Sequence, residues 1–158
     1  MLPAGQGLWP AFWTLGDNIS SVSWPACGEI DIMETVGAEP LVNHGSMHGP
    51  VSPGSATSYN LTGTAPAPAS MLSTSFHTYA IEWDPGSVTF LLDDVPYETQ
   101  TPATLTQLAA SGVWEFDHPF FIVLNVAVGG TFPGSPNATT TFPQTMKVDW
   151  VRVYERAD

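Results

Sequence analysis

Residues 28–35 read Gly-Glu-Ile-Asp-Ile-Met-Glu-Thr, an alternation of acidic and apolar side chains that predicts a β-strand. In a regular strand Glu29 and Asp31 share one face, whereas the two isoleucines point to the other. Strict alternation would send Glu34 into the apolar interior, where an unpaired charge is costly. One extra residue, a β-bulge at about Met33, restores the phase and returns Glu34 to the acidic face.

This bulged spacing predicts a pair of catalytic carboxyl groups. Glu29 and Glu34 would lie about four strand steps apart, roughly 13 Å between Cα atoms, and could lean inward to a carboxyl separation of about 5 Å. That separation is typical of a retaining glycosidase, with one nucleophile and one acid/base. Asp31, between them, would hold a proton on a neighbour or orient the nucleophile. The alternative is a solvated acidic face, which repulsion between like charges disfavours.

Short apolar stretches of the same kind recur along the chain, separated by turns rich in Gly and Pro. Residues 81–91 predict a hairpin whose turn contains Pro85 and Gly86. A single short helix is predicted, over residues 102–109. Many short strands with regular turns predict an all-β fold of antiparallel strands, either a β-sandwich or a jelly roll. The expected strands cover residues 28–36, 42–48, 76–83, 87–92, 120–128 and 146–154.

Residues 50–75 differ from the rest in having few large apolar side chains and many Pro, Ser, Thr, Gly and Ala. We expect a long loop there, either the rim of a binding site or a flexible segment. The 158 residues show no internal repeat and no boundary, so we expect one domain over residues 1–158.

The charge balance excludes several classes of function. With 15 acidic and 3 basic residues, the formal net charge is −12, which would repel nucleic acids and acidic membrane surfaces. The longest apolar runs, such as residues 120–128, fall short of the roughly 20 residues that span a bilayer. The start of the chain has no signal-peptide pattern. Cys27 is the single cysteine, which excludes an internal disulfide and a multi-cysteine metal site.

Three tryptophans, Trp9, Trp13 and Trp24, precede the carboxylates. Indole rings stack on the apolar faces of sugars, so tryptophans beside carboxylates are typical of a cleft for a neutral polysaccharide. Packing in the core is the alternative for each of them. Trp83 and Trp150 lie in alternating stretches, and we expect these two in the core.

Two histidines follow the carboxylates, in a stretch expected to pair with the acidic strand. His44, Ser46 and His48 would share one face of that neighbouring strand. His48 could then hydrogen-bond Glu34 or a sugar hydroxyl and so tune the pKa of the acid/base. The two histidines could instead hold a metal, although no third ligand is evident.

Taken together, these motifs resemble glycoside hydrolase family 16, and within it the laminarinase-like endo-β-1,3-glucanases. The stretch over residues 28–35 in the company of the other motifs is far more specific than two carboxylates alone. The resemblance covers essentially the whole chain and is weakest over residues 50–75. The matching segments are residues 5–13, 24–34, 44–49, 76–83, 120–130 and 148–154.

The resemblance implies a concanavalin A-like jelly roll whose concave sheet forms a cleft for β-1,3-glucan. It implies that Glu29 is the nucleophile, Asp31 its electrostatic assistant and Glu34 the acid/base, with retention of configuration. It also implies substrate contacts from Trp9, Trp13, Trp24, His48 and Asn125. The alternative is a β-glucan-binding jelly roll that is non-catalytic or inactive through truncation, and the presence of all three carboxylates favours the enzyme.

The resemblance implies no cofactor for catalysis. Many relatives hold a structural Ca²⁺ on the convex side, and Asp149 matches one carboxylate ligand of that site. Residues 1–158 match the C-terminal two-thirds of a family domain, so we expect sheet edges and apolar faces that are open to water or to another chain. We further expect a monomer, and an extracellular or periplasmic location for the full-length protein.

Overall fold

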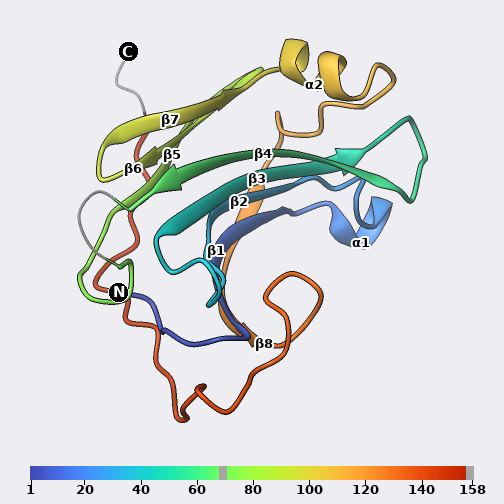
Figure 1. The fold of residues 1–158 in the computed structure, drawn as a ribbon. Coiled ribbons are helices and arrows are strands. Elements are labelled where there is room, and N and C mark those ends of the chain that lie inside the picture. Colours follow the sequence, from blue (N-terminus) through green and yellow to red (C-terminus); the bar gives the residue numbers. More distant parts are fainter. Residues whose placement is uncertain (68–70, 156–158) are drawn as a thin grey trace.

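Two antiparallel sheets form the computed structural model, which describes residues 1–67 and 71–155. The strands are β1 Leu8–Gly16, β2 Glu29–Glu34, β3 Val42–Pro50, β4 Ser58–Pro66, β5 Tyr79–Asp84, β6 Ser87–Leu92, β7 Val95–Gln100 and β8 Phe120–Val128, and the helices are α1 Ile19–Val22 and α2 Pro102–Leu108. The large sheet has the order β4-β3-β2-β1-β8 and the small one β5-β6-β7. Figure 1 shows the small sheet layered over the β3–β4 side of the large sheet, with β8 on the far side. The predicted all-β antiparallel sandwich is confirmed.

The main core lies between the two sheets. Ile30, Met47 and Leu61 are cross-strand neighbours on β2, β3 and β4, so their side chains form one buried row. Val88 and Phe90 of β6 pack in the same cluster from the small sheet. Burying a side chain of this size contributes roughly 1.5–3 kcal/mol, so this cluster fixes which face of β2 points inward.

The predicted bulge in β2 is present. Asp31 pairs with Ser46 and Glu34 with His44, so three steps along β2 face two steps along β3. The register of β2 against β1 also skips one residue before Met33. The extra residue keeps Glu34 on the same face of the sheet as Asp31, as the sequence pattern requires.

The predicted hairpin and the helix predicted over residues 102–109 are confirmed, the latter as α2, whereas the short helix α1 was not predicted. Asp84 pairs with Ser87 across the turn between β5 and β6, and Gly86 has a φ of +73°, which glycine adopts without strain. The helix α2 begins after Thr101, whose side chain accepts a hydrogen bond from the backbone of Thr104. Among the residues that the structure describes, no helix is both long and apolar enough to cross a bilayer.

The loop predicted over residues 50–75 is wrong in its middle part, where β4 forms. Tyr59 and Leu61 are buried and alternate with exposed Asn60, but the next inward position is Gly63, which carries no apolar signal. A Cβ at Gly63 would lie 2.4 Å from Cγ of Glu98 on β7, so the close approach of that strand requires glycine. The strands β1 and β7 were not predicted either, since each contains a proline, which usually disfavours a strand.

The strand predicted over residues 146–154 is absent. This segment has no ladder partner within residues 1–67 and 71–155, and a strand forms only where a neighbour satisfies its N–H and C=O groups. Trp150 is 47% exposed, so its expected place in the core is wrong. Trp83 is 39% exposed, so its expected place in the core is also wrong, although its ring packs edge-on against Phe120 and its Nε1 donates to the carbonyl oxygen of Phe116.

Candidate active site

Three rows of paired residues cross the large sheet, and each contains one acidic residue of β2. Directly opposed residues of antiparallel strands project to the same side, so all three carboxylates share one face, here named the site face. The bulge makes this possible, because without it Glu34 would be out of phase with Asp31 and Glu29. The rows are Ala11–Glu34–His44, Trp13–Asp31–Ser46 and Leu15–Glu29–His48.

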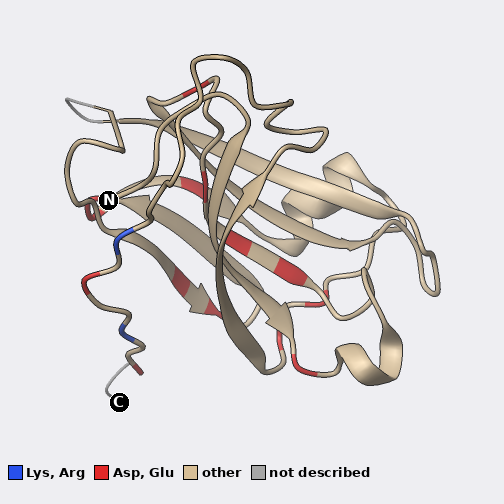
Figure 2. Ribbon diagram, turned by 90° about the horizontal axis from the view of Figure 1, so that it is seen from below, with Lys and Arg blue, Asp and Glu red and all other residues tan. Residues whose placement is uncertain are grey.

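The described basic residues lie together in the C-terminal segment, interspersed with acidic ones (Figure 2). Figure 2 shows acidic bands on the strands in the middle of the molecule, whereas the basic positions lie close to the C-terminus. The described basic side chains are Lys147 and Arg152. The site face therefore carries concentrated negative charge without a lysine or arginine partner among the described residues.

A hollow of about 200 Å³ lies on the site face. The predicted carboxylates are brought together there with three of the five predicted substrate contacts. Ala11 and Ala127, which were not predicted, leave room beside the tryptophans. The alternation of side chains along β1 and β8 would have placed both alanines on this face. The lining residues are Trp9, Ala11, Trp13, Glu29, Asp31, Glu34, Asn125 and Ala127.

Hydrogen bonds hold the two lining tryptophans in place. Nε1 of Trp9 donates to Oε1 of Glu34 at 2.9 Å, and Nε1 of Trp13 donates to Oδ1 of Asn125 at 2.7 Å. Each indole is fixed by its polar edge, which leaves the apolar ring as part of the hollow's wall. Phe132, in the loop after β8, was not predicted; it packs edge-on against Trp9 with ring centroids 5.4 Å apart.

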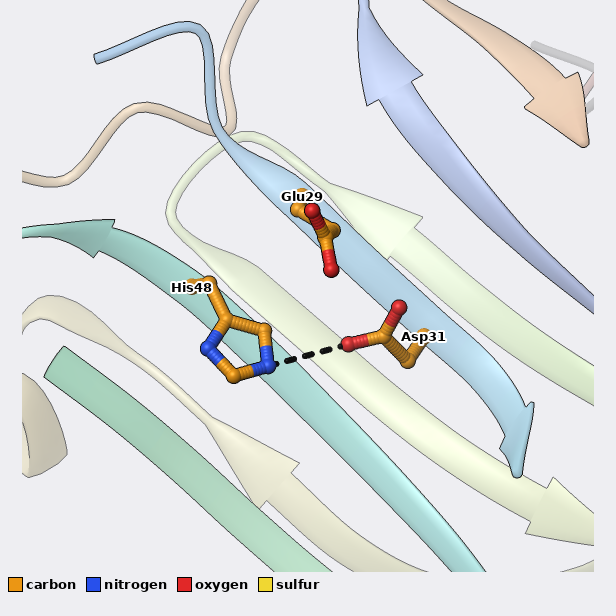
Figure 3. Close-up of side chains that lie close together, drawn as sticks. All are labelled: Glu29, Asp31 and His48. Carbon is orange, nitrogen blue, oxygen red and sulfur yellow. Dashed lines mark ion pairs between the residues drawn. The ribbon is translucent and has the colours of Figure 1, made fainter. Parts of the chain in front are cut away.

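The two remaining predicted contacts, Trp24 and His48, do not line the hollow but contact its carboxylates. The Trp24 side chain hydrogen-bonds Glu29, and its ring centroid lies 6.4 Å from that of His48. Nε2 of His48 lies 3.1 Å from Oδ2 of Asp31, without the alignment of a hydrogen bond (Figure 3). Trp24 and His48 therefore influence the protonation of the carboxylates that line the hollow.

The predicted contact between His48 and Glu34 is wrong. The strands β2 and β3 run antiparallel, so the later histidine meets the earlier carboxylates, and His44 lies opposite Glu34. Nε2 of His44 in turn pairs with Oε2 of Glu39 at 2.9 Å. His44 and His48 are thus separated along the strand and do not form the histidine metal pair that was the alternative.

The three carboxyl groups share an environment that favours their protonated forms. Burial is the main cause that raises the pKa of Glu29, Asp31 and Glu34 to about 7. The charge of Asp31 raises the pKa of both glutamates further, while His48 and a hydrogen bond from Trp24 lower that of Glu29. Near neutral pH the cluster therefore holds protons and negative charge together, as one acid and one base would require.

Metal-binding geometry is found on the site face and not at the residue predicted for it. The ligand atoms of Glu29, Asp31 and His48 all lie within 4.8 Å of one another. Asp149 is exposed and is not grouped with other acidic, His or Cys side chains in the part of the chain described. A Ca²⁺ ion takes six to eight oxygen ligands, which Asp149 alone does not supply, so this Ca²⁺ site stays a prediction.

Comparison with known proteins decides the family. The sequence profile named Glycosyl hydrolases family 16 matches residues 2–152. This chain belongs to glycosyl hydrolase family 16. The predicted resemblance is therefore confirmed, and the large sheet that carries the site face belongs to a family 16 jelly roll.

The relatives of this family 16 chain include solved structures. It is 41% identical to the β-glucanase of Rhodothermus marinus, over 97% of this chain and 54% of that protein. It is similar to the laminarinase catalytic domain of Thermotoga maritima (44% identity, TM-score 0.79, covering 90% of this chain and 56% of that one). It is also similar to the endo-β-1,3-glucanase of Pyrococcus furiosus (46%, TM-score 0.80, 90% and 53%). The chain spans about half the length of the curated relatives it matches.

Proposed function

We propose that this family 16 chain hydrolyses internal β-1,3 bonds of a neutral glucan with retention of configuration. The observation that carries the proposal is the bulge in β2, which places Glu29, Asp31 and Glu34 on one face beside a tryptophan-lined hollow. The names of the relatives, a β-glucanase, a laminarinase and an endo-β-1,3-glucanase, support the choice of substrate.

The first step forms a covalent glycosyl–enzyme. The Glu29 carboxylate attacks the anomeric carbon, and Glu34 gives its proton to the glycosidic oxygen as the C–O bond breaks. In the second step the Glu34 carboxylate takes a proton from water, whose oxygen attacks the anomeric carbon and releases Glu29. Two inversions at one carbon give net retention. Asp31 lies between the two glutamates and assists the nucleophile.

The surroundings of the two glutamates let them share a proton between these roles. Burial and the charge of Asp31 raise the pKa of both Glu29 and Glu34 to about 7, whereas His48 and one tryptophan hydrogen bond to each glutamate lower it. Near neutral pH one glutamate can therefore be charged while the other is protonated. When Glu29 becomes an ester its negative charge disappears, so the pKa of Glu34 falls and Glu34 is ready to act as the base.

The lining of the hollow supports a neutral polysaccharide as substrate. Trp9 and Trp13 offer apolar ring surface for sugar C–H groups, and Asn125 offers an amide for hydroxyl groups. A formal net charge of −12 and the carboxylates in the hollow would repel a sulfated or uronic-acid polymer. Because a polymeric glucan does not enter a cell, the proposed function requires that the protein acts outside it.

Release of reducing sugar from laminarin by the chain and by its Glu29→Gln variant tests this proposal. We expect turnover to fall by at least about a thousandfold in the variant, because the nucleophile is lost while the shape is kept. Glu82→Gln, the same substitution on an exposed position of β5, is the matched control and should keep full activity.

The outcome also separates cleavage from binding. Retained laminarin binding by Glu29→Gln, measured by calorimetry, supports a nucleophile that is not needed for recognition. Turnover that persists in Glu29→Gln, or that is absent from the unaltered chain, would overturn the proposal. Binding by the unaltered chain without any product would favour the glucan-binding alternative.

A further inference from the structure

We propose that Glu29, Asp31 and His48 form a binding site for a divalent transition-metal ion of the zinc class, and that such an ion inhibits the enzyme. Their ligand atoms lie within 4.8 Å of one another, and Figure 3 shows the three side chains converging from two neighbouring strands. Binding of the ion is independent of the proposed hydrolysis, whereas its inhibitory effect rests on that function.

Backbone pairing holds the three ligands in place. Glu29 and His48 are directly paired across β2 and β3, and Asp31 follows two residues later on the same face. In a tetrahedral zinc site, bonds of about 2.0–2.2 Å place the ligand atoms roughly 3.3 Å apart. The distance of 3.1 Å between His48 Nε2 and Asp31 Oδ2 already fits one such edge. Side-chain rotation of Glu29 would close the other two.

A buried oxygen without a hydrogen bond provides a second indication of a ligand. Oδ2 of Asp31 is buried without a hydrogen-bond partner, and the residue is only 4% exposed. Its ion-pair partner, Nε2 of His48 at 3.1 Å, lacks the alignment of a hydrogen bond, so the desolvation penalty of this oxygen is only partly offset and a bound ion would remove the rest. This oxygen faces Nε2 of His48, the nitrogen that would be the second ligand (Figure 3).

The chemistry of the donors selects the class of metal. Zinc accepts both imidazole nitrogen and carboxylate oxygen, and a site with three protein ligands leaves its fourth position to water. Ca²⁺ and Mg²⁺ prefer oxygen ligands alone and more of them. Glu29 and Asp31 line the hollow, so the open position of a bound ion would face the space where the substrate lies.

The same placement makes the ion an inhibitor. Coordination occupies the Glu29 lone pair that must attack the anomeric carbon, and the ion fills the space next to it. Metal and glucan therefore exclude each other. The expected kinetic result is a rise in the apparent KM for laminarin with zinc concentration, reversed by a chelator.

Calorimetric titration of the chain with zinc chloride tests the site, with His48→Gln as the ligand variant. Removing one of three protein ligands should weaken binding at least about tenfold. His44→Gln is the matched control: it changes a histidine on the same face of β3 that pairs with Glu39 instead, and should leave the affinity unchanged. Circular dichroism checks that both variants keep the fold, and the absorption spectrum of bound Co²⁺ reports the coordination number.

Each outcome decides for or against the site. Affinity unchanged in His48→Gln, equal losses in both variants, or no binding at millimolar zinc would overturn it. Binding that depends on His48 in a chain without laminarin turnover would support the site and overturn the proposed function. Turnover that zinc does not affect, together with no binding, would overturn the site and leave the function standing.

Discussion

The strands β2 and β8 both pair with β1, one on each side, yet their surroundings are opposite. β2 carries three acidic residues and is almost wholly buried, whereas β8 is almost entirely apolar and largely exposed. The small sheet explains much of the difference: β5 packs on β2 and β7 on β4, whereas on β8 a ring contact joins Trp83 of β5 to Phe120, the first residue of that strand. Burial therefore follows from what covers a strand, and not from its hydropathy alone.

The largest expected effect on stability comes from replacing one isoleucine with alanine on each of the two strands. Ile30 of β2 is fully buried, so Ile30→Ala should lower the free energy of unfolding by about 2–5 kcal/mol. Ile122 of β8 is 43% exposed, and Ile122→Ala should lower it by less than about 1 kcal/mol. Urea unfolding measures both values. Equal losses would show that Ile122 is buried in solution, for example between two copies of the chain.

The pH dependence of stability tests the buried charge of β2. Because the pKa of Asp31 is raised to about 7 in the fold, the folded chain binds more protons than the unfolded one between about pH 4 and 7. The stabilisation of the folded state by protonation of Asp31 is complete below about pH 4 and is lost as the pH rises through 7. We expect the melting temperature to fall by a few degrees from pH 5 to 8.

Asp31→Asn should remove much of this dependence, since the group can no longer ionise. Asp149→Asn, in the exposed C-terminal segment, is the matched control and should keep the profile of the unaltered chain. A melting temperature that rises between pH 5 and 8, or an unchanged profile in Asp31→Asn, would contradict a raised pKa at this position.

The smallest effect is expected in residues 146–154, an apolar stretch that belongs to neither sheet. Val153 is 80% exposed, so Val153→Ser should change the free energy of unfolding by no more than about 0.5 kcal/mol. Denaturant titration measures the change. A loss above about 2 kcal/mol would mean that this segment is packed against another surface in solution.

The site could be predicted from the sequence because its defining feature is local. The phase of Glu34 relative to Glu29 and Asp31 requires a bulge wherever the strand is half-buried, and the register of both neighbouring strands contains it. The pairing of His48 depended on which residue of the next strand lies opposite, and that register was not assigned from the sequence. The contact was therefore placed on Glu34, whereas His48 lies opposite Glu29 and pairs with Asp31.

The fold class could be predicted from the sequence. Individual strands could not be predicted where tertiary contacts decide whether a strand forms. The strand β4 has glycine where β7 approaches closely, so its signal is weak although its pairing is strong. Residues 146–154 show the reverse: their alternation is clear, but their described backbone pairing is confined to Lys147 with Met1 and does not extend into a ladder. Local pattern predicts the capacity to form a strand, while a partner decides whether it forms.

Azide rescue of glycine variants tests most directly the claim that the bulge joins a nucleophile and an acid/base on one face. With an activated aryl β-laminaribioside, Glu29→Gly plus azide should give the α-glycosyl azide, because azide replaces the nucleophile in a single inversion. Glu34→Gly plus azide should give the β-glycosyl azide, because azide intercepts the intermediate on Glu29. Proton NMR of the anomeric centre distinguishes the two products. The opposite configurations, or rescue of neither variant of a chain that is active when unaltered, would contradict the account.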